Sequence, residues 1–181
     1  MRKYISAVLL IITVITLTSC TARKAQNEGY LVYRSSPVGV QIEYPDFWEM
    51  AEDKKTHTVA FAAPSEGYGD GYRDNVSICV SDLGERDMAF DNYVKSYTEK
   101  LPSTIKGYTL VSQGMYALEG YEAYRIVYEG ETEDGLLRLQ QTFIKNGKYM
   151  YIYSFIAEPK SYDYFNKNSE IMLSTLVPLL K

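Results

Sequence analysis

The sequence is poor in the residues from which most catalytic and metal sites are built. His57 is its only histidine, so a transition-metal site with several imidazole ligands is excluded. It contains no Gly-x-Ser-x-Gly elbow, no phosphate-binding glycine loop and no His-Glu-x-x-His motif. Cys79 would need His57 within hydrogen-bond reach to act as a nucleophile, and a free cysteine is more often a small buried residue. We therefore expect no enzymatic activity, no cofactor and no bound transition metal.

An excess of positive charge is also lacking. Nineteen Lys and Arg residues stand against 23 Asp and Glu residues, which gives a formal net charge of −4. Binding to nucleic acid needs clustered Lys and Arg to neutralise phosphates, and electrostatic binding to anionic lipid needs a polybasic patch. The composition argues against both.

The N-terminal twenty residues have the layout of an export signal. Arg2-Lys3 precede an uncharged apolar run over residues 4–17, which is too short for a membrane-spanning helix. The run ends in Leu-Thr-Ser-Cys20, which resembles the lipobox of bacterial lipoproteins. The resemblance implies that residues 1–19 are cleaved and that Cys20 carries acyl chains such as palmitate. It places the mature protein on the extracytoplasmic face of the cell membrane or outer membrane.

Cleavage would remove two basic residues and no acid, so the net charge would go from −4 to −6. An acylated Cys20 would leave Cys79 without a partner for an intramolecular disulfide. Residues 20–29 are polar and predict a lipidated tether. Residues 30–181 have the length of one domain.

Alternating apolar and polar residues predict strands over 39–44, 58–62 and 75–81. A four-strand meander is expected over 108–157, because Gly120, Asp134-Gly135 and Asn146-Gly147 are hairpin signals. Three glutamates near its second turn share one strand face and predict a solvated sheet edge: Glu129, Glu131 and Glu133.

Two segments have helical periodicity. Residues 87–101 predict a helix capped by Asp87 and ended by Pro102. A last helix is expected to open at Pro159 and to close at Pro178. Its inward stripe consists of Tyr162, Phe165, Ser169, Met172 and Leu176. The expected fold is α+β, an antiparallel sheet of about six to seven strands flanked by helices.

Two short motifs resemble those of PsbP-like domains. The segment Gly39-Val-Gln-Ile-Glu-Tyr-Pro-Asp-Phe-Trp48 resembles their opening Gly-x-x-Ile-x-Tyr-Pro-x-x-Trp. The segment Gly120-Tyr-Glu-Ala-Tyr-Arg125 resembles their central Gly-x-x-Ala-Tyr-Arg strand. The resemblance implies an α/β/α sandwich of the PsbP/Mog1 type. Relatives include extracytoplasmic lipoproteins and photosystem accessory subunits, and they offer no catalytic residues to transfer to this chain.

Eighteen tyrosines against one tryptophan make aromatic contact surfaces the leading candidates for binding. Tyr149, Tyr151 and Tyr153 share one strand face, which would be an open aromatic platform or a covered layer. Trp48 would be a recognition residue or a core plug. Two loop tyrosines, Tyr68 and Tyr72, complete the candidate binding set.

Asp70, Asp74 and Asn75 offer oxygen ligands for Ca²⁺, but their spacing does not match the known calcium loop, and a hairpin tip is the simpler interpretation. The sequence therefore predicts a membrane-anchored, non-catalytic accessory or binding module that docks onto an envelope protein. The alternative is a small-molecule or glycan receptor that uses the aromatic sheet face.

Overall fold

The computed structural model describes residues 25–65, 67, 72–84 and 89–181. Seven of its strands form one antiparallel sheet in the order β3-β4-β5-β9-β8-β7-β6. Their bounds are β3 Glu49–Asp53, β4 Thr58–Ala62, β5 Asn75–Asp82, β6 Thr109–Leu118, β7 Tyr121–Thr132, β8 Gly135–Asn146 and β9 Tyr149–Ala157. This confirms the predicted α+β class and the number of strands in the main sheet.

The meander is confirmed, because β6 to β9 follow one another as antiparallel neighbours. Its three connections fall on the predicted turns, where Gly120, Gly135 and Gly147 all have a positive φ. Glycine adopts this backbone conformation without the steric cost that other residues meet. The local turn chemistry therefore sets the register of the hairpins.

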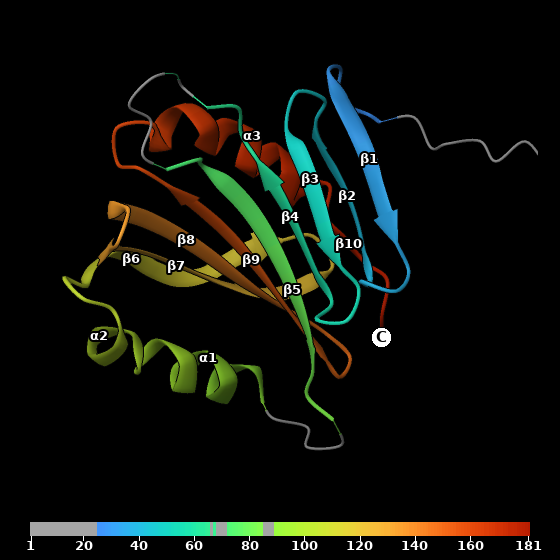
Figure 1. Ribbon diagram of the computed structural model, residues 1–181. Coiled ribbons are helices and arrows are strands. Elements are labelled where there is room, and N and C mark those ends of the chain that lie inside the picture. The colour runs from blue at the N-terminus through green and yellow to red at the C-terminus, as the bar shows by residue number, and fades with distance from the viewer. Residues whose placement is uncertain (1–24, 66, 68–71, 85–88) are drawn as a thin grey trace, which may run out of the picture.

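A separate three-stranded sheet, which the sequence analysis did not foresee, has the order β1-β2-β10. It comprises β1 Tyr30–Ser35, β2 Val40–Pro45 and the short β10 Val177–Pro178. Together with helix α3 (Tyr162–Ser174) it lies against one face of the large sheet, as Figure 1 shows. The buried side chains between these layers, among them Ile42, Phe61 and Tyr153, form the α3-side core.

The opposite face is covered in part by α1 (Phe90–Thr98) and the short α2 (Leu101–Thr104), as Figure 1 shows. Phe90, Val94 and Leu101 pack there with strand residues to form the α1-side core. The predicted cap Asp87 lies outside the described residues, and α1 follows Ala89. Pro102 does not end a helix as predicted. It lies in the first turn of α2, where its missing N–H leaves no helical hydrogen bond unmade.

The last helix begins at Tyr162 and not at Pro159, because the Glu158 carbonyl accepts the N–H groups of Ser161 and Tyr162 in a preceding turn. Its predicted inward stripe is buried. Leu176 is buried as well but lies beyond the helix. Pro178 belongs to β10.

One expectation about the edges of the large sheet was wrong, and one edge strand was not predicted. Glu129 and Glu131 lie in β7, which is paired on both sides and is therefore no edge, and Glu133 lies in the turn that follows. The edges are β6 and β3. All five residues of β3 are exposed, so this strand has no apolar alternation by which the sequence could reveal it.

Gly39 is the position where backbone conformation and packing constrain the residue together. Its φ is +87°, and an added Cβ would lie 2.6 Å from the Leu180 Cδ1 atom. We predict that Gly39→Ala lowers the free energy of unfolding by about 1 kcal/mol or more beyond Gly120→Ala. The control is matched because Gly120 has φ +80° and open space around the added atom. Equal losses in urea denaturation would show that the packing of Leu180 is irrelevant.

Candidate functional site

Of the two interpretations of the aromatic strand face, the structure has the covered layer and not the open platform. Tyr151 and Tyr153 are 0% exposed beneath α3 and the small sheet. The Tyr151 hydroxyl donates to the Gly39 carbonyl at 3.1 Å and accepts the Leu180 N–H at 3.0 Å. The Tyr153 hydroxyl donates to the Ser169 carbonyl at 2.8 Å. Because both rings and both hydroxyls are used inside the fold, this face offers no platform to a glycan.

The third tyrosine, Tyr149, is half-buried at the end of β9, with the Lys148 ammonium 5.1 Å from its ring centroid. Burial raises the pKa of Tyr151, and it raises the pKa of Tyr153 far above its ordinary value. These hydroxyls therefore stay protonated hydrogen-bond donors and are not acid–base groups.

Trp48 is a core residue, as the simpler of the two interpretations held. It is 4% exposed and meets Phe165 of α3 edge to face, with ring centroids 6.0 Å apart. Its indole nitrogen is buried without a hydrogen-bond partner. Its neighbour Phe47 is 55% exposed, so the exposed aromatic of this loop is the one that the sequence analysis passed over.

The structure describes only part of the glycine-rich segment that carries the candidate calcium ligands. Asp70 and Tyr68 lie outside the described residues. Asp74 is buried, and its Oδ1 accepts the Glu158 N–H at 3.0 Å, which ties this segment to the turn before α3. Asn75 donates to the Tyr72 hydroxyl at 2.8 Å. Among the described residues no three His, Cys, Asp or Glu side chains gather as metal ligands.

Cys79 and His57 do not form a nucleophilic pair. The His57 Nδ1 lies 2.7 Å from the Pro37 carbonyl, beside the small sheet. Cys79 is half-exposed and lies on the other face of β5, since its neighbours Ile78 and Val80 are buried in the α3-side core. The sheet separates the two side chains.

A polar network that the sequence analysis missed lies between α3 and the strands β6, β7 and β8. We call it the Arg125 network, and it consists of Arg125, Glu170, Gln140, Tyr116 and Thr142. The Arg125 guanidinium meets Glu170 through two nitrogens at 3.0 and 3.2 Å and stacks 3.7 Å from the Tyr116 ring centroid. Gln140, 3% exposed, donates to Glu170 at 2.8 Å.

Such bidentate contacts are strong and directional, so the Arg125 network fixes α3 on the sheet. Arg125 ends the motif that the sequence analysis quoted, and this position is the sequence signal that could have located the network. Glu170, which supplies the carboxylate of the network from α3, gave no sequence signal of its own.

A second polar contact holds the N-terminal segment on the domain. We call it the N-terminal clamp: the Glu43 carboxylate accepts the backbone N–H of Gln26 at 2.7 Å and that of Asn27 at 3.1 Å. The Asn27 amide also donates to it at 2.8 Å. Glu43 is only 6% exposed, and its own N–H donates to Thr175 Oγ1 at 3.0 Å. The clamp thus joins the N-terminal segment, β2 and the end of α3.

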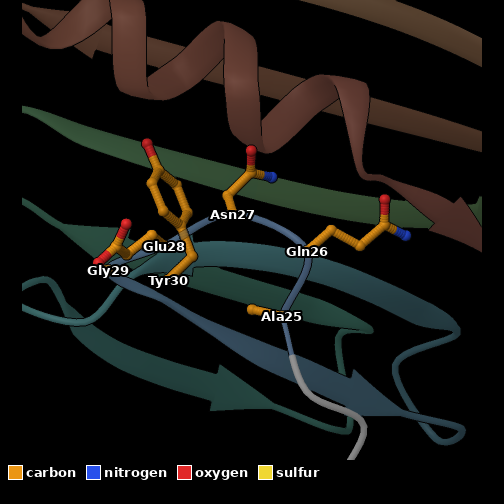
Figure 2. A pocket seen from close by; sticks show the side chains of 6 residues that line it. All are labelled: Ala25, Gln26, Asn27, Glu28, Gly29 and Tyr30. Atoms are coloured by element: carbon orange, nitrogen blue, oxygen red, sulfur yellow. The ribbon is translucent and has the colours of Figure 1, made fainter.

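A hollow of about 520 Å³ lies along the clamped segment and is lined by residues 25–30 (Figure 2). In Figure 2 the side chains of Asn27 and Tyr30 point toward α3, whose Asn168 donates to the Tyr30 hydroxyl at 3.0 Å. All lining residues are consecutive, so the hollow is the concave side of the segment itself and not a crevice between elements. Residues 26 and 27 of the predicted tether are therefore held on the domain.

Comparison with protein families finds one match over most of the chain. A family model described as PsbP-like protein matches residues 4–174. No curated protein matches the chain in sequence. In the part of the chain that the structure describes, none of the helices has the length and apolar character needed to cross a membrane.

Three solved structures share the fold, each with a TM-score of 0.62. A Pseudomonas aeruginosa protein of unknown function is 22% identical, with coverage of 84% of this chain and 99% of that one. Cyanobacterial PsbP (CyanoP) from Synechocystis sp. PCC 6803 is 16% identical, with coverage of 90% and 98%. LpqN of Mycobacterium tuberculosis, involved in cell envelope biogenesis, is 10% identical, with coverage of 78% and 83%.

The Arg125 network predicts a large difference between two glutamates. Glu170→Ala leaves a mostly buried guanidinium and the buried Gln140 amide without their acceptor, so we expect a loss of about 2–3 kcal/mol in the free energy of unfolding. Glu131→Ala, the control, removes an exposed pair with Lys106 and should cost below about 1 kcal/mol. Equal midpoints in guanidinium denaturation would contradict a fixing role of the network.

The N-terminal clamp predicts local release of the segment before the domain unfolds. A hydrogen bond to a charged group contributes about 1.5–3 kcal/mol. Its loss therefore corresponds to roughly 10- to 100-fold faster amide exchange. We therefore expect Glu43→Ala to accelerate amide exchange at Gln26 and Asn27 by that factor, while the amides of β9 keep their wild-type rates. Unchanged exchange at residues 26 and 27 would show that something else holds the segment.

The clamp also predicts a pH dependence. Burial acts to raise the pKa of Glu43, but the hydrogen bonds from Gln26 and Asn27 outweigh it and hold the pKa below its ordinary value of 4.5. A lowered pKa in the folded state means stabilisation that is full above pH 4.5 and lost as the pH falls through the lower, folded value. The exchange difference between wild type and Glu43→Ala should therefore shrink only below pH 4.5.

Proposed function

This chain belongs to the PsbP-like protein family, and from that premise we propose that it is a lipid-anchored accessory module of the cell envelope. Acyl chains on Cys20 hold it at the extracytoplasmic face of a membrane. Its single domain docks onto another envelope protein and performs no catalysis. The fold that it shares with LpqN, a protein involved in cell envelope biogenesis, supports this setting.

The observation that carries the proposal is the N-terminal clamp. The clamp holds the chain at Gln26, six residues after the proposed lipid-bearing Cys20. Six residues reach at most about 21 Å when fully extended. A domain clamped so close to its anchor stays next to the bilayer surface, within reach of membrane proteins. If all of residues 20–29 were a free linker, the domain could move farther from the membrane.

The anchor itself follows from the arithmetic of lipid insertion. Each buried CH₂ contributes about 0.8 kcal/mol, and a single acyl chain binds a membrane only marginally. Two or three chains on Cys20 would hold the protein firmly. The negative net charge of the chain then does not prevent membrane attachment, because hydrocarbon and not charge supplies the binding energy.

The proposal predicts that Cys20 alone determines where the protein is and what it contacts. In cells, wild type and Cys79→Ala should fractionate with membranes and crosslink to one stoichiometric envelope protein. Cys20→Ala should leave the membrane fraction and lose that partner. Mass spectrometry of the N-terminal peptide should show acylated Cys20 as the first residue.

Two results would contradict different parts of the proposal. An unmodified Cys20 or an intact segment 1–19 would overturn the lipid anchor. An acylated, membrane-bound protein without a stoichiometric partner would overturn the accessory role and leave the anchor standing. The Cys79→Ala control separates loss of lipid from a general effect of removing a cysteine.

A further inference from the structure

The two edges of the large sheet are protected to very different degrees. The edge strand β3, Glu49–Asp53, carries three acidic residues in five positions. The other edge strand, β6, has ten residues, Thr109–Leu118, and none of them is charged or proline. Natural proteins usually guard exposed edges with charges, proline or short length, because unpaired N–H and C=O groups invite another strand. The edge at β6 has only one guard, an irregularity between Leu110 and Ser112.

Beyond this irregularity, β6 is regular from Ser112 to Leu118. The two-residue turn at 119–120 makes Leu118 and Tyr121 the pair that closes the hairpin with β7. Bonding alternates along an antiparallel pair, so the N–H and C=O groups of Met115 and Ala117 point away from β7. This stretch thus presents a row of backbone groups to a further strand.

Gly114 is a second sign that another backbone comes close. Its φ is not in the positive region, and a Cβ added to it would meet nothing within 4 Å. The fold of the single chain therefore gives no reason for glycine at this position. Glycine within a strand often marks a site of close backbone approach.

Apolar side chains along β6 are exposed at the same edge. Met115 is 65% exposed, Val111 49% and Leu110 43%. Met115 also borders a groove of about 340 Å³ between α1 and the strands β6 and β7, together with Val94 and Tyr124. An added strand would cover these side chains and close the groove from one side.

We propose that β6 is a self-association site, at which two copies of this chain pair antiparallel with Met115 beside the two-fold axis. In this register Gln113 faces Ala117 of the second copy and Gly114 faces its Tyr116, so no like charges meet. The chain as a whole is acidic, with a net charge of −4, and acidic surfaces such as β3 would repel their own copies. The uncharged β6 is compatible with itself.

The contact is small, so the association is weak. The seven residues 112–118 that pair in this register are about 23 Å long, and an edge roughly 10 Å thick then buries on the order of 230 Å² per copy. A standard interface buries about 800 Å² per partner. Dimers should therefore form at micromolar or higher concentration, and attachment of two copies to one membrane would favour them by raising the local concentration.

The two edges supply a matched pair of methionines for the test. Met115 on β6 and Met50 on β3 are both exposed, at 65% and 43%. In full-length protein with Cys79→Ser, kept in its membrane, mild oxidation should link Met115→Cys into disulfide homodimers and leave Met50→Cys monomeric. Cys20 is the same in both variants, so its state cannot produce a difference between them.

A second measurement tests the strand in wild-type geometry. Sedimentation equilibrium of the full-length protein in detergent should show a mass that rises toward the dimer with concentration. Met115→Lys should weaken dimerisation at least tenfold at an unchanged melting temperature, and Met50→Lys should not. A wild type that stays monomeric to about 1 mM, equal trapping at both edges, or trapping of Met115→Cys to a different protein would each overturn the proposal.

Discussion

The structure depends on satisfying the polar tips of two large side chains that lie deep in its core. Tyr151 and Tyr153 project from β9 into the α3-side core, and their hydroxyls bond backbone groups of the small-sheet turn, the C-terminal segment and α3. A buried hydroxyl without a partner costs about 1–3 kcal/mol. The layers above β9 must therefore sit where their carbonyls reach these two rings, which fixes α3 and the C-terminus on the sheet.

Polar contacts at the margins of the same core set the outer pieces in place. The Arg125 network holds the middle of α3 against β7 and β8, and the N-terminal clamp holds the chain start against β2. Both use hydrogen bonds to a carboxylate, and such charge-assisted hydrogen bonds are stronger than those between neutral groups. The N-terminal segment consequently leaves the domain toward the proposed lipid anchor in one direction. The β6 edge stays uncovered at the far end of the sheet.

Much of the fold could be predicted because its signals are local. The turns at Gly120, Gly135 and Gly147 and the alternation of β4 and β5 identified six strands, four of them with their hairpins. Strand β3 escaped because all its residues are exposed, and a strand without a buried face has no apolar period. The helix end predicted at Pro102 was wrong, because proline can end one helix and can equally stand in the first turn of the next.

By itself the sequence determined the α+β class and the meander with its turns, because each follows from residues adjacent along the chain. The tertiary structure alone decided which tyrosines are covered, which strands are edges and which carboxylate meets Arg125. Those outcomes depend on pairs far apart in sequence, such as Arg125 with Glu170 and Glu43 with Gln26. Only the packing of helix and small sheet onto the large sheet brings such partners within hydrogen-bond distance.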